Sequence, residues 1–194
     1  MLSVLIEKEV INWNGGIMKK IFIGLLLIFI NFNLTLGAVK IGLFPDFLGY
    51  IVMLSGLTEM SGMSELFGKA KPWASGMAVY TGILYGMDLF GITIANLFSI
   101  VLGLTSLAIS LYISYNIVMG VIEVELNNKV DLNGENLKSA WKAMTLFNVI
   151  TYFSVFVTAL SVILIIGAII IAIYFLILFN KSKNMYYESF PYQT

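Results

Sequence analysis

Cysteine, histidine and arginine are all missing from this 194-residue sequence. Without cysteine the chain can form no disulfide, and without cysteine or histidine it cannot supply the usual ligand sets of zinc, haem or iron–sulfur clusters. The absence of histidine also excludes a histidine-based catalytic triad. The absence of arginine excludes the bidentate arginine clamp that binds phosphate in many enzymes. We therefore expect no metal and no cofactor.

Charge is scarce as well. Only 11% of the residues are charged and 59% are hydrophobic, whereas a soluble domain carries about a quarter charged residues to cover its surface. Apolar runs of about twenty residues recur along the chain, as they do in polytopic membrane proteins. A β-barrel would instead show short alternating strands and a polar lumen. The composition predicts an all-α, polytopic membrane helix bundle in contact with a lipid bilayer, and no nucleic-acid partner is expected.

Six apolar segments are expected to be transmembrane helices, at about 21–36, 45–60, 73–89, 92–125, 135–158 and 162–179. Pro45 suits a first helical turn because it lacks an N–H, and Asp46 beside it complements the helix dipole. That second span covers only ~22 Å, which is short for a hydrocarbon core of ~30 Å. Alternating apolar and polar residues after Asn31 predict extended chain at the end of the first span. Pro72 is expected to open the third span, and Asn133 to cap the fifth.

The positions of the lysines predict the orientation. All eleven basic residues are lysines, and isoleucine and asparagine are frequent, which is typical of an AT-rich bacterial genome. With the N-terminus in the cytoplasm, six spans leave Lys40 as the one lysine on the outer side, in agreement with the positive-inside rule. We therefore expect a multi-pass protein of the bacterial cytoplasmic membrane with both termini in the cytoplasm. Glu123 and Glu125, beyond the fourth span, are expected in cytosolic water.

The N-terminal segment differs from the rest of the chain. "MKKIFIGLLLIFI", starting at Met18, resembles a natural bacterial start, and the codons of Gly15 and Gly16 can spell a ribosome-binding sequence just before it. We expect residues 1–17 to be a mis-assigned start or a disordered tail, 18–183 a single six-helix transmembrane domain, and 184–194 a short cytoplasmic or interfacial tail. A cleaved signal peptide is the alternative for the first span, but Leu36 at the −3 position before Ala38 makes a poor cleavage site.

Small residues recur at helical spacing in three of the segments. Such positions let two helix backbones approach closely, and they leave open whether the partner is another helix of this chain or a second copy. The predicted packing positions are Gly49, Gly56, Ala74, Ala78, Gly82, Gly86, Ser99 and Gly103, followed by Ser106, Ser110 and Ser114 with the same period.

Three charges are expected on the outer side: Lys40, Asp46 and Asp88. Asp46 begins the second span and Asp88 ends the third, and consecutive spans are usually neighbours. Ionisable groups at such depths usually pair or face a cavity. These three residues, with Tyr50 and Tyr85, form our candidate polar cluster. The alternative is that Asp46 only serves its helix terminus and Asp88 is an interfacial loop residue.

Other polar residues inside the predicted spans are expected to make interhelical hydrogen bonds, worth about 0.6 kcal/mol each, rather than to bind a ligand. They are Asn96, Asn116, Asn148, Tyr112, Tyr115 and Tyr152.

Three stretches, "GLFPDFLGYIVMLSGL", "KAKPW" and "SLYISYNIVMG", resemble a group of small multi-spanning membrane proteins of low-GC Gram-positive bacteria that share a Pro-Asp-Phe-x-Gly-Tyr segment. The resemblance runs from about Met18 to Lys183. That group has no assigned activity, so the resemblance implies the class of protein and no chemistry.

Two functions remain open on the sequence. The short second span, interrupted by glycine and proline, favours a small solute or ion transporter or a channel-like protein, because broken helices mark binding sites in transporters. The small-residue faces favour a non-catalytic accessory protein that packs against a membrane partner or as a homodimer. An enzyme is not expected, because "YGMD" lacks the first glycine of the Gly-x-Gly-Asp motif of intramembrane aspartyl proteases, and both aspartates lie at the membrane edge.

Overall fold

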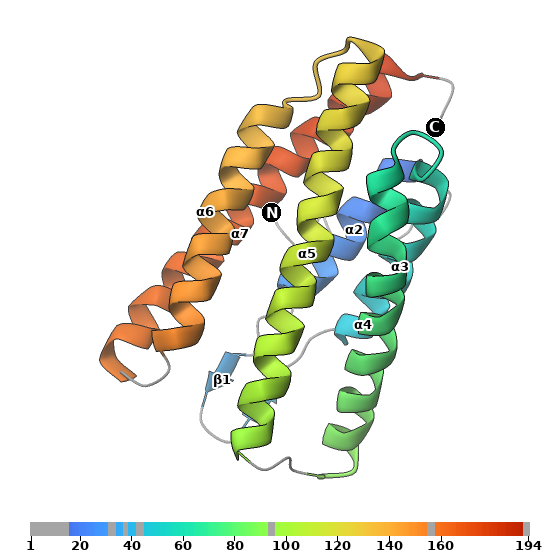
Figure 1. The fold of residues 1–194 in the computed structure, drawn as a ribbon. Helices are drawn as coiled ribbons and strands as arrows, with labels where there is room; N and C mark the ends of the chain where they lie inside the picture. Colours follow the sequence, from blue (N-terminus) through green and yellow to red (C-terminus); the bar gives the residue numbers. More distant parts are fainter. Residues whose placement is uncertain are drawn as a thin grey trace.

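The computed structural model describes residues 16–30, 34–36, 39–41, 45–92, 96–154 and 158–191. Within these residues the chain forms six helices and one small hairpin (Figure 1). The elements are α2 (Ile17–Ile30), β1 (Leu34–Leu36), β2 (Val39–Ile41), α3 (Asp46–Met60), α4 (Glu65–Leu89), α5 (Asn96–Asn128), α6 (Gly134–Phe153) and α7 (Thr158–Ser189). The all-α prediction is confirmed. Residues 1–15, which carry most of the segment assigned to a mis-assigned start, lie outside the described residues.

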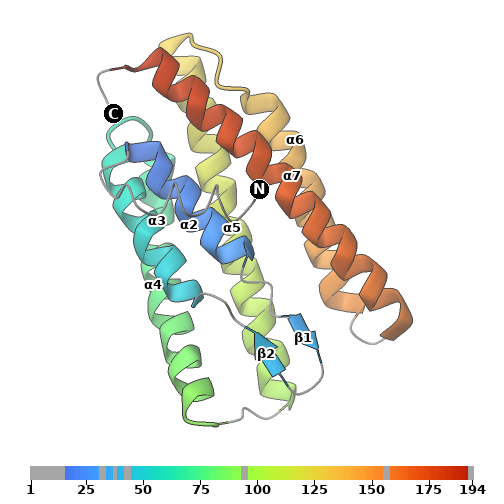
Figure 2. The ribbon, with the colours of Figure 1, turned by 180° about the vertical axis from the view of Figure 1, so that it is seen from behind.

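The helices run up and down, each packed against the next along the chain, and α2 also contacts α7 (Figures 1 and 2). The first and last helices come together at one end, where the backbone N–H of Lys19 donates to the Tyr187 hydroxyl at 2.9 Å. The α3–α4 and α5–α6 connections lie at this same end, because Ser64 contacts Glu123 and Tyr186 contacts Met63 there. We call it the lysine end.

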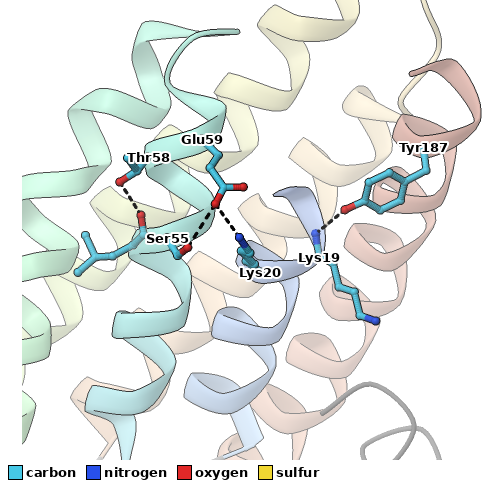
Figure 3. Close-up of polar contacts among 7 residues, drawn as sticks. Lys19, Lys20, Ser55, Thr58, Glu59 and Tyr187 are labelled. Atoms are coloured by element: carbon cyan, nitrogen blue, oxygen red, sulfur yellow. Dashed lines mark hydrogen bonds and ion pairs between the residues drawn. The ribbon is translucent and has the colours of Figure 1, made fainter. Parts of the chain in front are cut away.

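The lysine end gathers most of the charge. Lys20 of α2 pairs with Glu59 of α3 at 2.6 Å, and Ser55 donates to the same carboxylate oxygen (Figure 3). The other end of the bundle holds the strands β1 and β2, the ends of α4 and α6, and the starts of α5 and α7 (Figure 2). Among the side chains that the structure describes, the charged ones at that far end are those of Asp46 and Asp88.

Among the described residues, two helices are long and apolar enough to cross a membrane: Phe98–Asn128 in α5 and Val162–Ser189 in α7. The first helix is shorter than the predicted segment. It ends at Ile30, and the alternating residues that follow form antiparallel strands in which Leu34 pairs with Ile41. Alternation with a period of two suits a strand and not a helix, which is why the expected extended chain is found there.

Pro72 does not open a helix. Instead, α4 begins at Glu65, capped by the Ser64 hydroxyl, which accepts the Leu66 N–H at 3.2 Å, and Pro72 lies inside it. A proline ring clashes with the residue four positions earlier and removes that hydrogen bond. That residue is Gly68, which has no side chain and whose nearest neighbour to an added Cβ is 3.8 Å away, so the chain has room to adjust.

The two glutamates expected in cytosolic water instead connect elements. Glu123 accepts the Ser64 hydroxyl at 2.6 Å and so ties α5 to the start of α4. One carboxylate oxygen of Glu125 accepts the N–H groups of Leu132 and Gly134 at 2.8 and 2.9 Å. Asn133 occupies the capping position of α6, but its side chain makes no cap hydrogen bond. The carboxylate of Glu125 serves the start of α6 in its place.

The buried core lies in the half of the bundle next to the lysine end. The fully buried large side chains there include Ile21, Leu57, Phe67, Ile117 and Phe179. In the far half, α4, α5, α6 and α7 expose large apolar side chains such as Ile83, Phe98, Phe153 and Ile163. The boundary between these halves lies where α2 ends at Ile30 and α3 begins at Asp46, and it positions the site described next.

Candidate functional site: a polar pocket inside the bundle

A pocket of about 410 Å³ lies between α2, α3, α5 and α6. This volume falls at the lower end of the range of about 300–1,000 Å³ that is usual for small-molecule sites. Its apolar wall comes chiefly from α2 and α3, with Leu25, Ile28, Phe29 and Met53, and from Met144 of α6. Its polar groups come from Tyr50, Ser106, Ser110, Ser114 and Asn148.

The three serines follow one another every four residues on α5, so helical geometry places them on one face. The Tyr50 hydroxyl of α3 and the Ser110 hydroxyl of α5 share a hydrogen bond of 2.8 Å. Asn148 donates from its side-chain nitrogen to the Met144 carbonyl at 2.9 Å. The pocket is therefore a hydroxyl-rich groove within apolar walls.

Two aromatic side chains connect α6 to α5 on either side of this groove. Toward the lysine end, the Trp141 indole N–H donates to the Ser114 hydroxyl at 3.0 Å, and its ring packs at 5.2 Å from the Tyr115 ring. Toward the far end, the Tyr152 hydroxyl donates to the Ile100 carbonyl, and its ring edge lies against Gly103. The serine groove lies between these two bridges.

No Asp, Glu or Lys side chain is among the described residues that line the pocket. The groups that can exchange protons or hydrogen bonds there are the Tyr50 phenol, the serine hydroxyls and the Asn148 amide. Hydroxyls and an amide can instead exchange hydrogen bonds with a neutral polar molecule while the methionine and leucine side chains cover its apolar part. The arrangement suits reversible binding of a small uncharged molecule.

The predicted polar cluster divides between two places. The Phe47 and Tyr85 rings meet at 5.8 Å, so the start of α3 lies beside the end of α4, and Asp46 and Asp88 are at the same end of the bundle. Tyr85 is on the outer surface, whereas Tyr50 is buried and points to Ser110. The strand β2 contains Lys40, whose side chain lies outside the described residues.

The predicted packing glycines of α3 are the points at which it approaches α2. A Cβ added to Gly49 would lie 2.9 Å from the Gly24 carbonyl oxygen, and one added to Gly56 would lie 2.9 Å from the Ile21 nitrogen. Gly24 of α2 completes this close approach, although it is not among the predicted packing positions. No small-residue pattern indicates a packing role for Gly24, because it is the one small residue among the large apolar residues of the first span.

The predicted ladder of α4 is used only in part. Ala74 is fully buried and Gly82 lies near Phe47, but nothing lies within 4 Å of a Cβ added to Gly86. In α5, Ser99 is exposed and Gly103 contacts Tyr152. The serines Ser106, Ser110 and Ser114, predicted as packing positions, and Asn148, predicted as a hydrogen-bonding residue, line the pocket instead.

No cluster of three or more acidic side chains that could hold a metal ion occurs in the described part of the chain. Comparison with known proteins gives no relative: no protein-family model, no curated protein and no solved structure matches the chain. The function must therefore be argued from the pocket and from the distribution of charge.

Proposed function

We propose that the chain is a six-span protein of the bacterial cytoplasmic membrane with the lysine end in the cytoplasm. Long charge-free stretches support this: α4 has no charged side chain between Lys71 and Asp88, and α7 has none from Thr158 to Asn180. The most apolar windows of α5 and α7 are only 11% and 28% buried. Apolar surface left outside the core favours lipid as the solvent around the bundle.

The orientation can be tested with single cysteines, because the chain has none of its own. Gly62 lies in the α3–α4 connection with open space around it, and Phe90, 82% exposed, follows the end of α4. A membrane-impermeant maleimide added to intact cells is expected to label the Phe90→Cys variant and to spare Gly62→Cys until the cells are permeabilised. The reverse pattern would invert the proposed topology, and labelling of both in intact cells would refute a membrane barrier between them.

We further propose that the pocket binds a small uncharged solute and that the protein acts as a transporter or channel-like protein. The observation that carries this is the serine groove of α5 inside an otherwise apolar bundle, with Ser110 hydrogen-bonded to Tyr50 of α3. Polar groups in a membrane interior are costly unless they are paired. Tyr50, Ser110, Ser114 and Asn148 already have partners within the protein, and we propose that a ligand in the cavity uses the donors and lone pairs that remain to them.

Filling the pocket tests the binding site. The Ser110→Leu variant replaces a lining hydroxyl with a bulky apolar group, and Ser75→Leu makes the same change on the exposed face of α4. We expect thermal unfolding in detergent to be shifted upward by members of a panel of neutral alcohols, amides and sugars. A ligand at a hundredfold excess over its Kd contributes about 2.7 kcal/mol. Ser75→Leu should keep this shift and Ser110→Leu should lose it.

Stabilisation by charged amino acids or inorganic ions instead of neutral solutes would contradict the proposal, as would an unchanged shift in Ser110→Leu. Loss of the shift in Ser110→Leu is informative because Ser75→Leu makes the same serine-to-leucine exchange away from the pocket.

The second candidate function is a non-catalytic accessory subunit or a homodimer. Gly76 and Gly86 of α4 favour it, since an added Cβ at either position meets nothing within 4 Å. Small residues left open on an outer face suit contact with another helix. Size measurement in mild detergent separates the two: a monomer without a partner favours solute binding, and a stable dimer or complex favours the accessory role.

A further inference from the structure

A second hollow lies on the outside of the bundle, along the line where α4 and α5 meet. It has a volume of about 430 Å³ and is lined by Pro72, Trp73, Gly76, Met77, Tyr80 and Ile109, with Thr105 and Ser106. Gly76 leaves it open, because nothing lies within 4 Å of a Cβ built there. Met77 is fully buried and forms part of its floor. The hollow is thus an outward-facing, largely apolar groove, which we call the α4–α5 groove.

Aromatic contacts mark both ends of the groove. Toward the lysine end, the rings of Trp73 and Tyr112 meet edge to face at 5.5 Å. Toward the far end, the Tyr80 hydroxyl donates to the Leu102 carbonyl at 3.2 Å. Seven residues of α4 separate the two aromatic positions, which at about 1.5 Å per residue gives a groove roughly 10 Å long.

The Lys69 side chain supplies a positive charge next to the end of the groove that carries Trp73. Lys69 precedes Trp73 by four residues, so it lies on the same face of α4 one turn nearer the lysine end. Lys69 is exposed, and neither Lys69 nor Lys71 forms an ion pair with any described residue. The exposed Glu65 lies one further turn toward the lysine end. The groove therefore has an unpaired positive charge at its mouth and an apolar body.

We infer that the α4–α5 groove binds an anionic phospholipid of the cytoplasmic leaflet. The phosphate lies at Lys69, the Trp73 indole lies at the level of the headgroups, and one acyl chain follows the groove past Gly76 to Tyr80. Lysines beside a membrane attract anionic headgroups, and tryptophan is enriched at that depth. The inference rests on the proposed membrane location and does not depend on what the inner pocket binds.

Quenching of Trp73 fluorescence tests the inference. With Trp13 and Trp141 replaced by phenylalanine, Trp73 reports alone in phosphatidylcholine vesicles that contain one brominated lipid. We expect brominated phosphatidylglycerol to quench Trp73 more strongly than brominated phosphatidylcholine at the same mole fraction. Lys69→Gln should lower this preference about fivefold, the factor that corresponds to one lysine near an anionic surface. Lys181→Gln, an exposed lysine of α7 at the same end, should leave it unchanged.

Gly76→Leu tests the position of the acyl chain. Its side chain projects into open space and should not disturb folding, but it fills the groove and should reduce quenching by brominated phosphatidylglycerol to the level of phosphatidylcholine. Thr105→Leu, on the opposite wall, should act in the same direction.

Equal quenching by the two lipids, or a preference that survives Lys69→Gln, would overturn the inference. Competition by millimolar inorganic phosphate would overturn it too, because it would identify a site for a free anion. If neither brominated lipid quenches Trp73, the protein does not lie in the bilayer, and the proposed membrane function fails with it. Equal quenching by both lipids leaves the membrane location standing.

Discussion

Replacing Gly24 with alanine is expected to destabilise the bundle by about 1–2 kcal/mol, although alanine is the better helix former. In the middle of a helix, glycine costs about 0.5–1 kcal/mol relative to alanine. At Gly24 this gain is outweighed by overlap with α3. An added Cβ would lie 2.7 Å from the Gly49 carbonyl oxygen and 2.9 Å from the Met53 nitrogen. Both are backbone atoms of a helix, so neither can rotate away.

The overlap can be relieved only by moving α2 and α3 apart. Their line of contact is long, because about two turns further along α3 Gly56 lies against Ile17 and Ile21 of α2. Separation would open the packing of Ile21, Met53 and Leu57, all of which are fully buried. Overpacking of a well-packed core typically costs about 1–3 kcal/mol, and subtracting the helix-propensity gain of about 0.5–1 kcal/mol leaves a net destabilisation of about 1–2 kcal/mol.

Gly86→Ala is the matched control. It adds the same methyl group to a helical glycine, but nothing lies within 4 Å of the new atom. Its expected effect is stabilisation by about 0.5–1 kcal/mol, from the helix propensity alone. Thermal unfolding of both variants in the same detergent measures the contrast. Equal shifts of the two variants would contradict the close approach of α2 and α3 at Gly24.

The Gly24 contact also shows what the sequence could predict. Gly49 and Gly56 were predicted as packing positions because they share a span with a second small residue at helical spacing. Their partner is a lone glycine in another helix, and no pattern within one helix can reveal which helix will face it. The hydrophobic runs predict where each helix lies in the sequence. Which faces of two helices pack together depends on contacts between distant residues, and a run within one helix does not reveal these.

The candidate site shows the same division. The spacing of Ser106, Ser110 and Ser114 predicts one face of a helix, and they do share the pocket wall. The sequence groups Tyr50 and Tyr85 with the aspartates because the predicted topology puts all four near the same membrane edge. The depth of a residue along a helix does not determine which way its side chain points around the helix axis. The Tyr50 side chain is buried and contacts Ser110, whereas the Tyr85 side chain is exposed.

Replacing Glu125 with alanine is expected to cost about 3 kcal/mol or more and to loosen the connection between α5 and α6. One carboxylate oxygen accepts two backbone N–H groups, those of Leu132 and Gly134. Hydrogen bonds to charged groups contribute about 1.5–3 kcal/mol each, and loss of the acceptor leaves both amides without a protein partner. Leu132 and Gly134 are buried, so water replaces the carboxylate only after local rearrangement.

Two further variants separate the hydrogen bonds from the charge. Glu125→Gln keeps an acceptor oxygen of similar reach but removes the charge, and we expect about half the loss, because charge-assisted hydrogen bonds are roughly twice as strong as neutral ones. Glu135→Gln removes a carboxylate of the same α6 start that is 81% exposed and pairs with Lys138 at 3.9 Å. Such surface pairs contribute about 0–1 kcal/mol.

Hydrogen exchange is the sharpest measurement for this series, because it reads the two amides directly. The Leu132 and Gly134 amides should exchange fastest in Glu125→Ala, more slowly in Glu125→Gln, and at the rate of the unchanged protein in Glu135→Gln. Uniform acceleration along the whole chain in Glu125→Ala would instead mean that the carboxylate stabilises the bundle globally. Unchanged protection of both amides would refute the capping role, because a connection held by backbone geometry alone does not need the carboxylate.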